Sequence, residues 1–351
     1  MKSTHQEDYR PSVDVLMRPS KGTNPRAPIY ALVDALPDDI NVVKFSWRRA
    51  LIGKWDVIHL HWPESAIRAS TRTRRWLKYV LFALLLLRIQ FGRKPAVWTV
   101  HNESPHERGK HLESLLLRWW ERATARRVYL YPSVTPDERG AAFIPFGDYS
   151  QVADRLMGDV QVERDPHRML LFGLLRPYKG IEQLLDAFDA LRHVDERVRL
   201  AVMGRPVDPE YGRAVDERVG ASATGVEFRG ELLEYEELVA QIRESGFVVL
   251  PYRRMYNSGA ALLSLSCGTP ILVPTSATMN DLMAESGPQW VQTYDGDLTP
   301  AILSAAVEQF ASSAPLREGA RALRGRSWSA VGEQYASLYR SLVPKSRPAT
   351  G

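Results

Sequence analysis

Short apolar runs alternate with helical patterns along the chain, in two series separated by one polar stretch. The first series lies at 13–17, 42–45, 57–60, 96–100 and 128–131, and the second at 169–172, 199–203, 226–228, 247–250 and 270–273. Strands that alternate with helices indicate a parallel sheet covered by helices on both faces. We therefore predict an α/β protein with two doubly wound, Rossmann-like domains that face each other across a cleft.

The domain boundary is expected in the polar stretch 158–168. We predict a first domain over 1–160, a second over 161–325, and a C-terminal segment over 326–345. The amphipathic pattern at 328–342 predicts a helix in that segment, which either closes the second domain or crosses back to the first. A chain of 351 residues is long enough for two separate cores.

The positive charge is concentrated in the N-terminal half. Residues 1–165 hold 26 Lys and Arg against 19 Asp and Glu, whereas 166–351 hold 20 against 22. A basic half favours an anionic partner: a membrane surface, a phosphate-bearing substrate or nucleic acid. The single cysteine, Cys267, excludes an intramolecular disulfide, and the N-terminus lacks the apolar core of a signal peptide. We expect a cytoplasmic protein without a spanning helix.

Two loops that follow strands of the second series have residues suited to phosphate. The loop after 169–172 contains Gly173, Arg176 and Lys179, directly before a helical pattern. A helix N-terminus has unpaired N–H groups and a partial positive charge, so an anion should offset cations placed there. The loop after 247–250 leads into a capped helix, and its candidate contacts to a diphosphate are Tyr252, Arg253, Asn257, Ser258 and Gly259. The alternatives are a solvated turn and an ordinary capped helix.

A third loop follows the first strand and contains Gly22, which could face the diphosphate from the other domain. Histidines end two further strands of the first series. His101 is a candidate catalytic base, because its ordinary pKa suits proton transfer near neutral pH, or it could hydrogen-bond a sugar hydroxyl. Glu107 is an alternative base. Our candidate acceptor contacts are His61, Trp62 and Asn102, and structural roles for these side chains are the alternative. No third ligand accompanies His59 and His61, so we expect no metal site.

The segment 65–102 has no acidic residue but contains eight Lys and Arg around the apolar stretch WLKYVLFALLLL. A second segment, 112–127, combines four arginines with Trp119 and Trp120. Basic residues beside Trp, Phe and Leu suit a helix at an anionic lipid interface, and a buried helix with basic ends is the alternative. Nucleic acid is not expected, because the residues between the cations are mainly aliphatic rather than stacking aromatics.

The chain resembles the GT-B glycosyltransferases, in particular the large group called family 4 or group 1. The matching stretches are LHWPE (60–64), WTVHNESPHE (98–107), FIPFGDY (143–149), FGLLRPYKGIEQLLDAF (172–188) and VLPYRRMYNSGAALLSLSCGTPILVP (249–274). The resemblance implies that the first domain binds the acceptor and the second a nucleotide-sugar. It also implies that Arg176 and Lys179 hold the donor diphosphate, that His101 lies near the transferred sugar, and that the final helix packs back onto the first domain.

The chain departs from the family pattern at two glutamates, which are usually eight positions apart and are Met255 and Leu263 here. Phe146 stands where the family usually has a histidine. These changes leave inversion and retention of configuration both open. The HWP, HNxxPHE and YxxxxNSG patterns look closer to bacterial exopolysaccharide transferases, some of which invert.

We therefore expect an enzyme that moves a hexose from a GDP- or UDP-sugar to a lipid-linked or polysaccharide acceptor. It would act as a peripheral protein at the cytoplasmic face of the membrane, with no cofactor and no metal. The alternatives are a non-catalytic homologue that binds glycan or lipid, and a nucleotide-sugar epimerase of the same fold. The sequence leaves the base, the sugar, the acceptor and the oligomeric state open.

Overall fold

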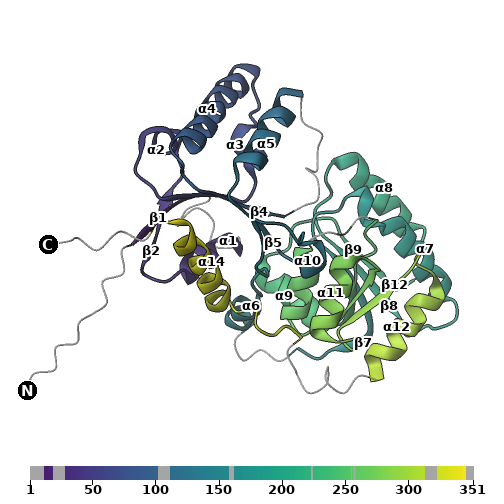
Figure 1. Cartoon of the computed structure of the whole chain (residues 1–351). Coiled ribbons are helices and arrows are strands. Elements are labelled where there is room, and N and C mark those ends of the chain that lie inside the picture. Colours follow the sequence, from purple (N-terminus) through teal and green to yellow (C-terminus); the bar gives the residue numbers. More distant parts are fainter. Residues whose placement is uncertain are drawn as a thin grey trace, which may run out of the picture. The chain divides into compact units, whose positions relative to one another are not determined.

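Two parallel six-stranded sheets organise the chain (Figure 1). The computed structural model describes residues 12–18, 28–101, 111–157, 162–222, 224–253, 255, 258–312 and 322–344. Its contacts define two compact units: the first comprises Met1–Gly147 with Arg326–Gly351, and the second comprises Asp148–Gly325. Within the described ranges, no helix is both long enough and apolar enough to cross a membrane.

The sheet of the first unit has the order β2-β1-β3-β4-β5-β6, and its paired strands all run parallel. The strands are β1 (Val13–Arg18), β2 (Ile40–Lys44), β3 (Val57–Leu60), β4 (Ala96–Val100), β5 (Arg126–Tyr129) and β6 (Ala141–Phe143). The first five coincide with the predicted runs. The strand β6 was not predicted, because three residues at a sheet edge are too few to form a recognisable apolar run.

Helices cover both faces of this sheet (Figure 1). They are α1 (Pro28–Ala35), α2 (Trp47–Ile52), α3 (Pro63–Ile67), α4 (Arg72–Phe91), α5 (His111–Ala123), the short η1 (Pro132–Val134) and α14 (Trp328–Leu342). One core lies between the sheet and helices α1 and α14, and the other between the sheet and helices α2 to α5. Gly332 allows the close approach of α14 to α1, because a Cβ atom there would overlap the Ala35 carbonyl oxygen. The C-terminal helix thus belongs to the first unit.

The sheet of the second unit has the order β12-β11-β10-β7-β8-β9, again parallel. The strands are β7 (Asp165–Phe172), β8 (Arg199–Met203), β9 (Val226–Arg229), β10 (Ser245–Val249), β11 (Ile271–Pro274) and β12 (Val291–Tyr294). Five of them coincide with the predicted runs. The edge strand β12, VQTY, has polar residues at its centre and was not predicted. Two parallel sheets of this kind confirm the predicted doubly wound α/β fold.

The second unit has seven described α-helices and one short 3₁₀ helix. They are α6 (Ser150–Met157), η2 (Pro177–Lys179), α7 (Ile181–Arg192), α8 (Pro209–Gly220), α9 (Tyr235–Glu244), α10 (Gly259–Ser266), α11 (Ala277–Ser286) and α12 (Pro300–Ser312), the 3₁₀ helix being η2. Side-chain caps fix several helix starts, as where Asp208 accepts a hydrogen bond from the Tyr211 N–H. Helix α6 packs against α9 and α10, so it lies in the second unit. The division between the units therefore falls before α6, whereas the expected boundary at 158–168 falls after it.

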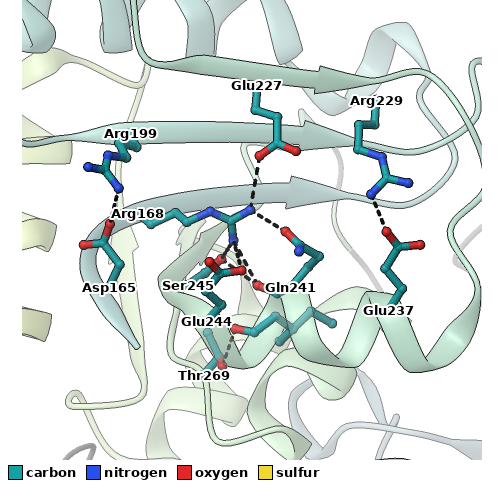
Figure 2. Close-up of polar contacts among 11 residues, drawn as sticks. Asp165, Arg168, Arg199, Glu227, Arg229, Glu237, Gln241, Glu244, Ser245 and Thr269 are labelled. Carbon is teal, nitrogen blue, oxygen red and sulfur yellow. Dashed lines mark hydrogen bonds and ion pairs between the residues drawn. The ribbon is translucent and has the colours of Figure 1, made fainter. Parts of the chain in front are cut away.

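A buried arginine ties the amino end of β7 to its neighbours (Figure 2). Arg168 is 7% exposed and donates hydrogen bonds to Ser245 Oγ (2.8 Å) and to the Gln241 carbonyl (3.2 Å). Its guanidinium also lies 3.5 Å from a Glu227 carboxylate oxygen on β9 and 3.7 Å from one of Glu244 on α9. A buried charge needs such partners, because its desolvation is otherwise costly. The network lies at the opposite end of the strands from the loops considered next.

Candidate active site

The strand order reverses once in each sheet, between β1 and β3 in the first unit and between β7 and β10 in the second. Open parallel sheets bind ligands at such switch points, beyond the carboxyl ends of the strands. The predicted phosphate loops follow β7 and β10, and the predicted histidines follow β3 and β4. The topology thus places both predicted groups at the carboxyl edges of their own sheets.

Glycines hold the loops after β7 and β8 in conformations that other residues rarely adopt. Gly173 has φ +96°, Gly204 has φ +142° and Gly180 has φ +68°. A Cβ atom on Gly204 would overlap the Gly173 carbonyl oxygen, and one on Gly180 would overlap the Pro251 carbonyl oxygen. The backbones of the loops after β7, β8 and β10 therefore approach closely, and the two predicted phosphate loops are in contact.

Lys179 is a buried cation at the centre of these loops. It is 7% exposed, its Nζ donates a 3.3 Å hydrogen bond to the Phe172 carbonyl, and Nζ lies 4.9 Å from the centre of the Tyr252 ring. Burial, with a further contribution from the charge of Arg176, lowers the pKa of Lys179 to about 8. Gly173 leaves room beside the amine, because a Cβ atom there would lie 3.2 Å from Nζ.

Positive charge predominates around Lys179. Among the described residues, no carboxylate forms an ion pair with Arg176, Lys179 or Arg253. The Arg253 N–H donates to the Tyr178 carbonyl (3.0 Å), which joins the loop after β10 to η2. A buried ammonium without a counter-ion is unfavourable, so an anionic ligand at this position would stabilise it. The arrangement can bind a phosphate or diphosphate.

Tyr252 contributes an aromatic ring to the same loops. Its side chain is 6% exposed, its hydroxyl has no hydrogen-bond partner among the described residues, and burial raises its pKa. The ring of Tyr178 packs edge-on against it at 6.0 Å between centroids. The buried hydroxyl therefore has hydrogen-bonding capacity available for a ligand.

Helix α10 begins beyond the same loop. Ser258 is its N-cap, and the Ser258 Oγ accepts a 3.2 Å hydrogen bond from the Ala261 N–H. Gly259 opens the helix and is exposed, which keeps the first turn accessible. Met255, which is partly exposed, and Leu263, which is buried, stand at the two positions where the family usually has glutamates, so neither position has a carboxylate. The groups that this region offers to a ligand are therefore cations and backbone N–H groups.

The histidines of the first unit form a buried pair. His61 Nδ1 lies 3.0 Å from His101 Nε2, and Trp62 stacks on His101 with ring centroids 4.3 Å apart at 16°. Burial lowers the pKa of His101 to about 3, and burial with the neighbouring histidines lowers that of His61 well below its ordinary value. Both rings are therefore neutral near pH 7. A neutral imidazole can accept a proton or orient a hydroxyl group.

A hydrogen-bond network behind this pair was not predicted from the sequence. His59 Nδ1 lies 2.6 Å from the Tyr339 hydroxyl, and His59 Nε2 lies 2.8 Å from Thr99 Oγ1. Thr99 Oγ1 in turn lies 3.0 Å from the Tyr335 hydroxyl. The His59 ring packs 4.2 Å from that of His61, so α14 supports the pair from behind. The signal available in the sequence was the spacing of two tyrosines on one face of the final helix.

A cavity of about 240 Å³ opens at the switch point between β1 and β3. Its lining residues are Arg18, Leu60, His61, Trp62, Ser65 and Ala66. Trp62 is 39% exposed, and His61 Nε2 is buried without a partner among the described residues. The cavity therefore combines an aromatic surface, an unused polar atom and a cation, which suits a sugar with an anionic group. Arg18 was not predicted as a site residue.

Four predicted site residues lie outside the described ranges: Gly22, Asn102, Glu107 and Asn257. The other predicted residues group by unit. His61, Trp62 and His101 lie together in the first, and Gly173, Arg176, Lys179, Tyr252 and Arg253 lie together in the second. Ser258 and Gly259 begin the helix that follows the same loop. Among the described residues, no group of three or more His, Cys, Asp or Glu could hold a metal ion.

Comparison with solved structures identifies the fold. The Anabaena protein HepE, solved in complex with UDP, has a TM-score of 0.64 at 13% identity, covering 95% of this chain and 100% of that one. An Escherichia coli structure described as trehalose-6-phosphate bound with UDP-2-fluoro glucose has a TM-score of 0.60 at 9% identity, covering 95% of this chain and 100% of that one. The fold is that of the GT-B glycosyltransferases.

Sequence comparison gives the family. Residues 166–311 match the family described as glycosyl transferases group 1. A protein of Xanthomonas campestris pv. campestris, GDP-mannose:glycolipid 4-beta-D-mannosyltransferase, is 35% identical over 350 residues, covering 97% of this chain and 95% of the relative. The chain belongs to the group 1 glycosyltransferases, and it is a glycosyltransferase enzyme. The expected family resemblance is confirmed, and the relationship favours a transferase over the epimerase and non-catalytic alternatives.

Proposed function

We propose that this enzyme transfers mannose from GDP-mannose to a glycolipid acceptor. The observation that carries the proposal is the buried ammonium of Lys179, between two loops at the β7–β10 switch point, which forms no ion pair with a carboxylate of the described residues. The identity of the donor is supported by the name of the Xanthomonas relative, which aligns with nearly the whole chain. The cations of the loops match the charge of a nucleotide diphosphate.

The second unit would stabilise the leaving group. When the bond between the sugar and the phosphate breaks, negative charge develops on the diphosphate. Arg176 and Lys179 supply fixed positive charge there, and the first turn of α10 supplies N–H groups. The buried position of Lys179 strengthens its effect, because a low local dielectric weakens screening. These groups supply the positive charge that the proposed reaction needs, so the scheme includes no metal.

The first unit would bind the acceptor and activate it. The name of the Xanthomonas relative specifies a 4-beta linkage. GDP-mannose carries its sugar in α linkage, so a β product requires inversion in a single displacement. A base must then remove the proton of the acceptor hydroxyl while the new bond forms. We assign this role to His101, which His61 and Trp62 hold in place; Glu107 remains the alternative.

The low pKa of His101 makes the neutral form available for catalysis but limits its strength as a base. A pKa of about 3 keeps the ring neutral near pH 7, so it can accept a proton at any physiological pH. It also makes the free imidazole a weak base. An anionic substrate bound beside His101 would raise this pKa toward neutrality and so increase its basicity.

The cavity between β1 and β3 is our proposed acceptor site. Trp62 offers a surface for stacking a sugar ring, and Arg18 offers a charge for a phosphate or carboxylate group of a lipid-linked glycan. Such an acceptor lies in a bilayer, so the enzyme would meet it as a peripheral protein. We place this reaction at the cytoplasmic face of the membrane.

Purified enzyme should be incubated with labelled GDP-mannose and membrane lipid extract, and label in the organic phase should be measured. UDP-glucose and UDP-N-acetylglucosamine serve as competing donors, and NMR of the product assigns its anomeric configuration. Lys179→Met should abolish most of the transfer, whereas Arg155→Met, on the exposed face of α6, should not change it. Folded enzyme that neither binds GDP nor transfers or hydrolyses any of these donors would overturn the proposal. Conversion of a donor without acceptor would instead favour an epimerase.

A further inference from the structure

Helix α4 has two apolar faces, although a helix that covers a sheet needs only one. Its first face consists of Tyr79, Phe82, Leu85, Leu86 and Ile89, which are buried in the core between the sheet and helices α2 to α5. Figure 1 shows α4 as an outer helix of the first unit on this side of the sheet. The buried face accounts for the contacts that attach the helix to its unit.

The second face is exposed, and we call it the α4 stripe. Its residues and exposed fractions are Trp76 (53%), Leu77 (58%), Val80 (54%), Leu84 (46%), Leu87 (37%) and Phe91 (80%). With about 100° per residue, these six positions fall within an arc of about 100°. The centre of that arc lies nearly opposite the buried face. The α4 stripe is therefore one continuous apolar strip that runs along the helix and points away from the sheet.

Single exposed apolar residues are common, but an aligned set of six, including a tryptophan and a phenylalanine, marks a surface that is covered in function. Leu115 on α5, which is 46% exposed, extends the apolar area. Helix α5 packs beside α4, and Trp119 Nε1 donates a hydrogen bond to Gln90 Oε1 (3.3 Å). The exposed area thus belongs to two helices held together in one rigid pair.

Cations surround the α4 stripe and are of two kinds. Lys78, Arg88 and Lys94 donate hydrogen bonds to backbone carbonyls of their own unit. In contrast, five others are exposed and form no ion pair with a carboxylate among the described residues: Arg72, Arg74, Arg93, Arg118 and Arg122. They lie at both ends of α4 and on α5. An apolar strip between unpaired cations is complementary to a surface that is apolar inside and anionic at its rim.

We propose that the α4 stripe and its flanking arginines dock this enzyme on an anionic lipid surface, with α4 lying in the plane of the interface. The apolar side chains would enter the boundary between headgroups and acyl chains, and the arginines would contact lipid phosphates. A second copy of the chain fits less well, because pairing two stripes would bring like charges together. The inference rests on the proposed function, in which the acceptor is a glycolipid.

The test is flotation of the full chain with phosphatidylcholine vesicles, with and without phosphatidylglycerol. We expect binding that depends on phosphatidylglycerol and weakens as salt increases. Trp76→Gln with Phe91→Gln should lower the partition coefficient by about tenfold or more. The matched control is Val194→Gln with Leu232→Gln, two residues of the second unit that are 81% and 73% exposed. This control should leave partition unchanged.

Equal partition of the stripe and control variants would overturn the proposal, as would binding that ignores lipid charge. Loss of self-association in the stripe variant, without loss of vesicle binding, would show that a second copy covers the surface. Mannose transfer to a water-soluble acceptor analogue separates this inference from the proposed function. The stripe variant should retain that transfer. If wild-type enzyme binds vesicles but transfers nothing from any donor, the proposed function fails and the docking surface stands.

Discussion

Replacing Lys179 with methionine tests whether this lysine is buried in order to bind an anion. Burial lowers its pKa from 10.5 to about 8, a difference of about 2.5 units. At about 1.36 kcal/mol per unit, the charged form destabilises the ligand-free fold by about 3 kcal/mol near neutral pH. The methionine variant loses one hydrogen bond to the Phe172 carbonyl, worth about 1 kcal/mol. We therefore expect Lys179→Met to stabilise the free protein by about 2 kcal/mol.

The same substitution should weaken donor binding. A charge-assisted hydrogen bond to phosphate contributes about 1.5–3 kcal/mol, so GDP affinity should fall by roughly 10-fold to 150-fold. Urea denaturation measures the stability, and isothermal titration calorimetry measures the affinity. At a pH near 8, wild-type enzyme should also take up protons on binding GDP, because the anion raises the lysine pKa. The variant should lose this uptake.

The pH dependence gives a further check. Between the folded pKa of about 8 and the unfolded value of 10.5, the unfolded chain binds more protons at Lys179. The contribution of this residue to the unfolding free energy therefore rises with pH across that window and is constant below it. The reasoning would be refuted if Lys179→Met were less stable than wild type near neutral pH while its GDP affinity stayed within about twofold.

Three further outcomes are expected. Tyr339→Phe removes the hydroxyl that is hydrogen-bonded to His59 and leaves a buried ring nitrogen without a partner. Urea denaturation should therefore show that the unfolding free energy falls by about 1–3 kcal/mol. A fall of less than about 0.5 kcal/mol would contradict the network. His101→Gln should lower kcat by about 10²-fold to 10⁴-fold in the mannosyl transfer assay while GDP binding is unchanged; a wild-type rate would remove its assigned role. His59 and His101 are neutral in the fold, with pKa values of about 3 against 6.5 in the unfolded chain. The unfolding free energy should therefore fall as pH drops from 6.5 toward 3, by up to about 1.4 kcal/mol per pH unit for each histidine. Denaturation curves at several pH values that show no such slope, or the same slope in His101→Gln, would argue against buried neutral rings.

The fold was largely predictable because its signals are local. An apolar run between turn residues forms a strand whatever its distant neighbours are, and the alternation with helices selects a parallel sheet. The edge strands β6 and β12 were missed because they are short or half polar. The position of the candidate phosphate loops after β7 and β10 was also predictable, since parallel strands end at one edge of a sheet.

The boundary between the units and the support of the histidines could not be predicted in this way. Helix α6 follows the first series of strands in sequence, but it packs on the second unit. His59 contacts Tyr339, which lies 280 positions further along the chain. No spacing rule relates residues so far apart, because the contact depends on how α14 packs on the sheet.

The sequence by itself determined which residue types were available at the site: Arg176 and Lys179 after one strand, and His61, Trp62 and His101 after two others. The tertiary structure decided their chemical state. Lys179 has a lowered pKa and the histidines are neutral because distant segments exclude water from them, and desolvation disfavours the charged forms. It also decided which apolar face of α4 is covered by the sheet and which remains exposed, because helical periodicity alone does not distinguish the two.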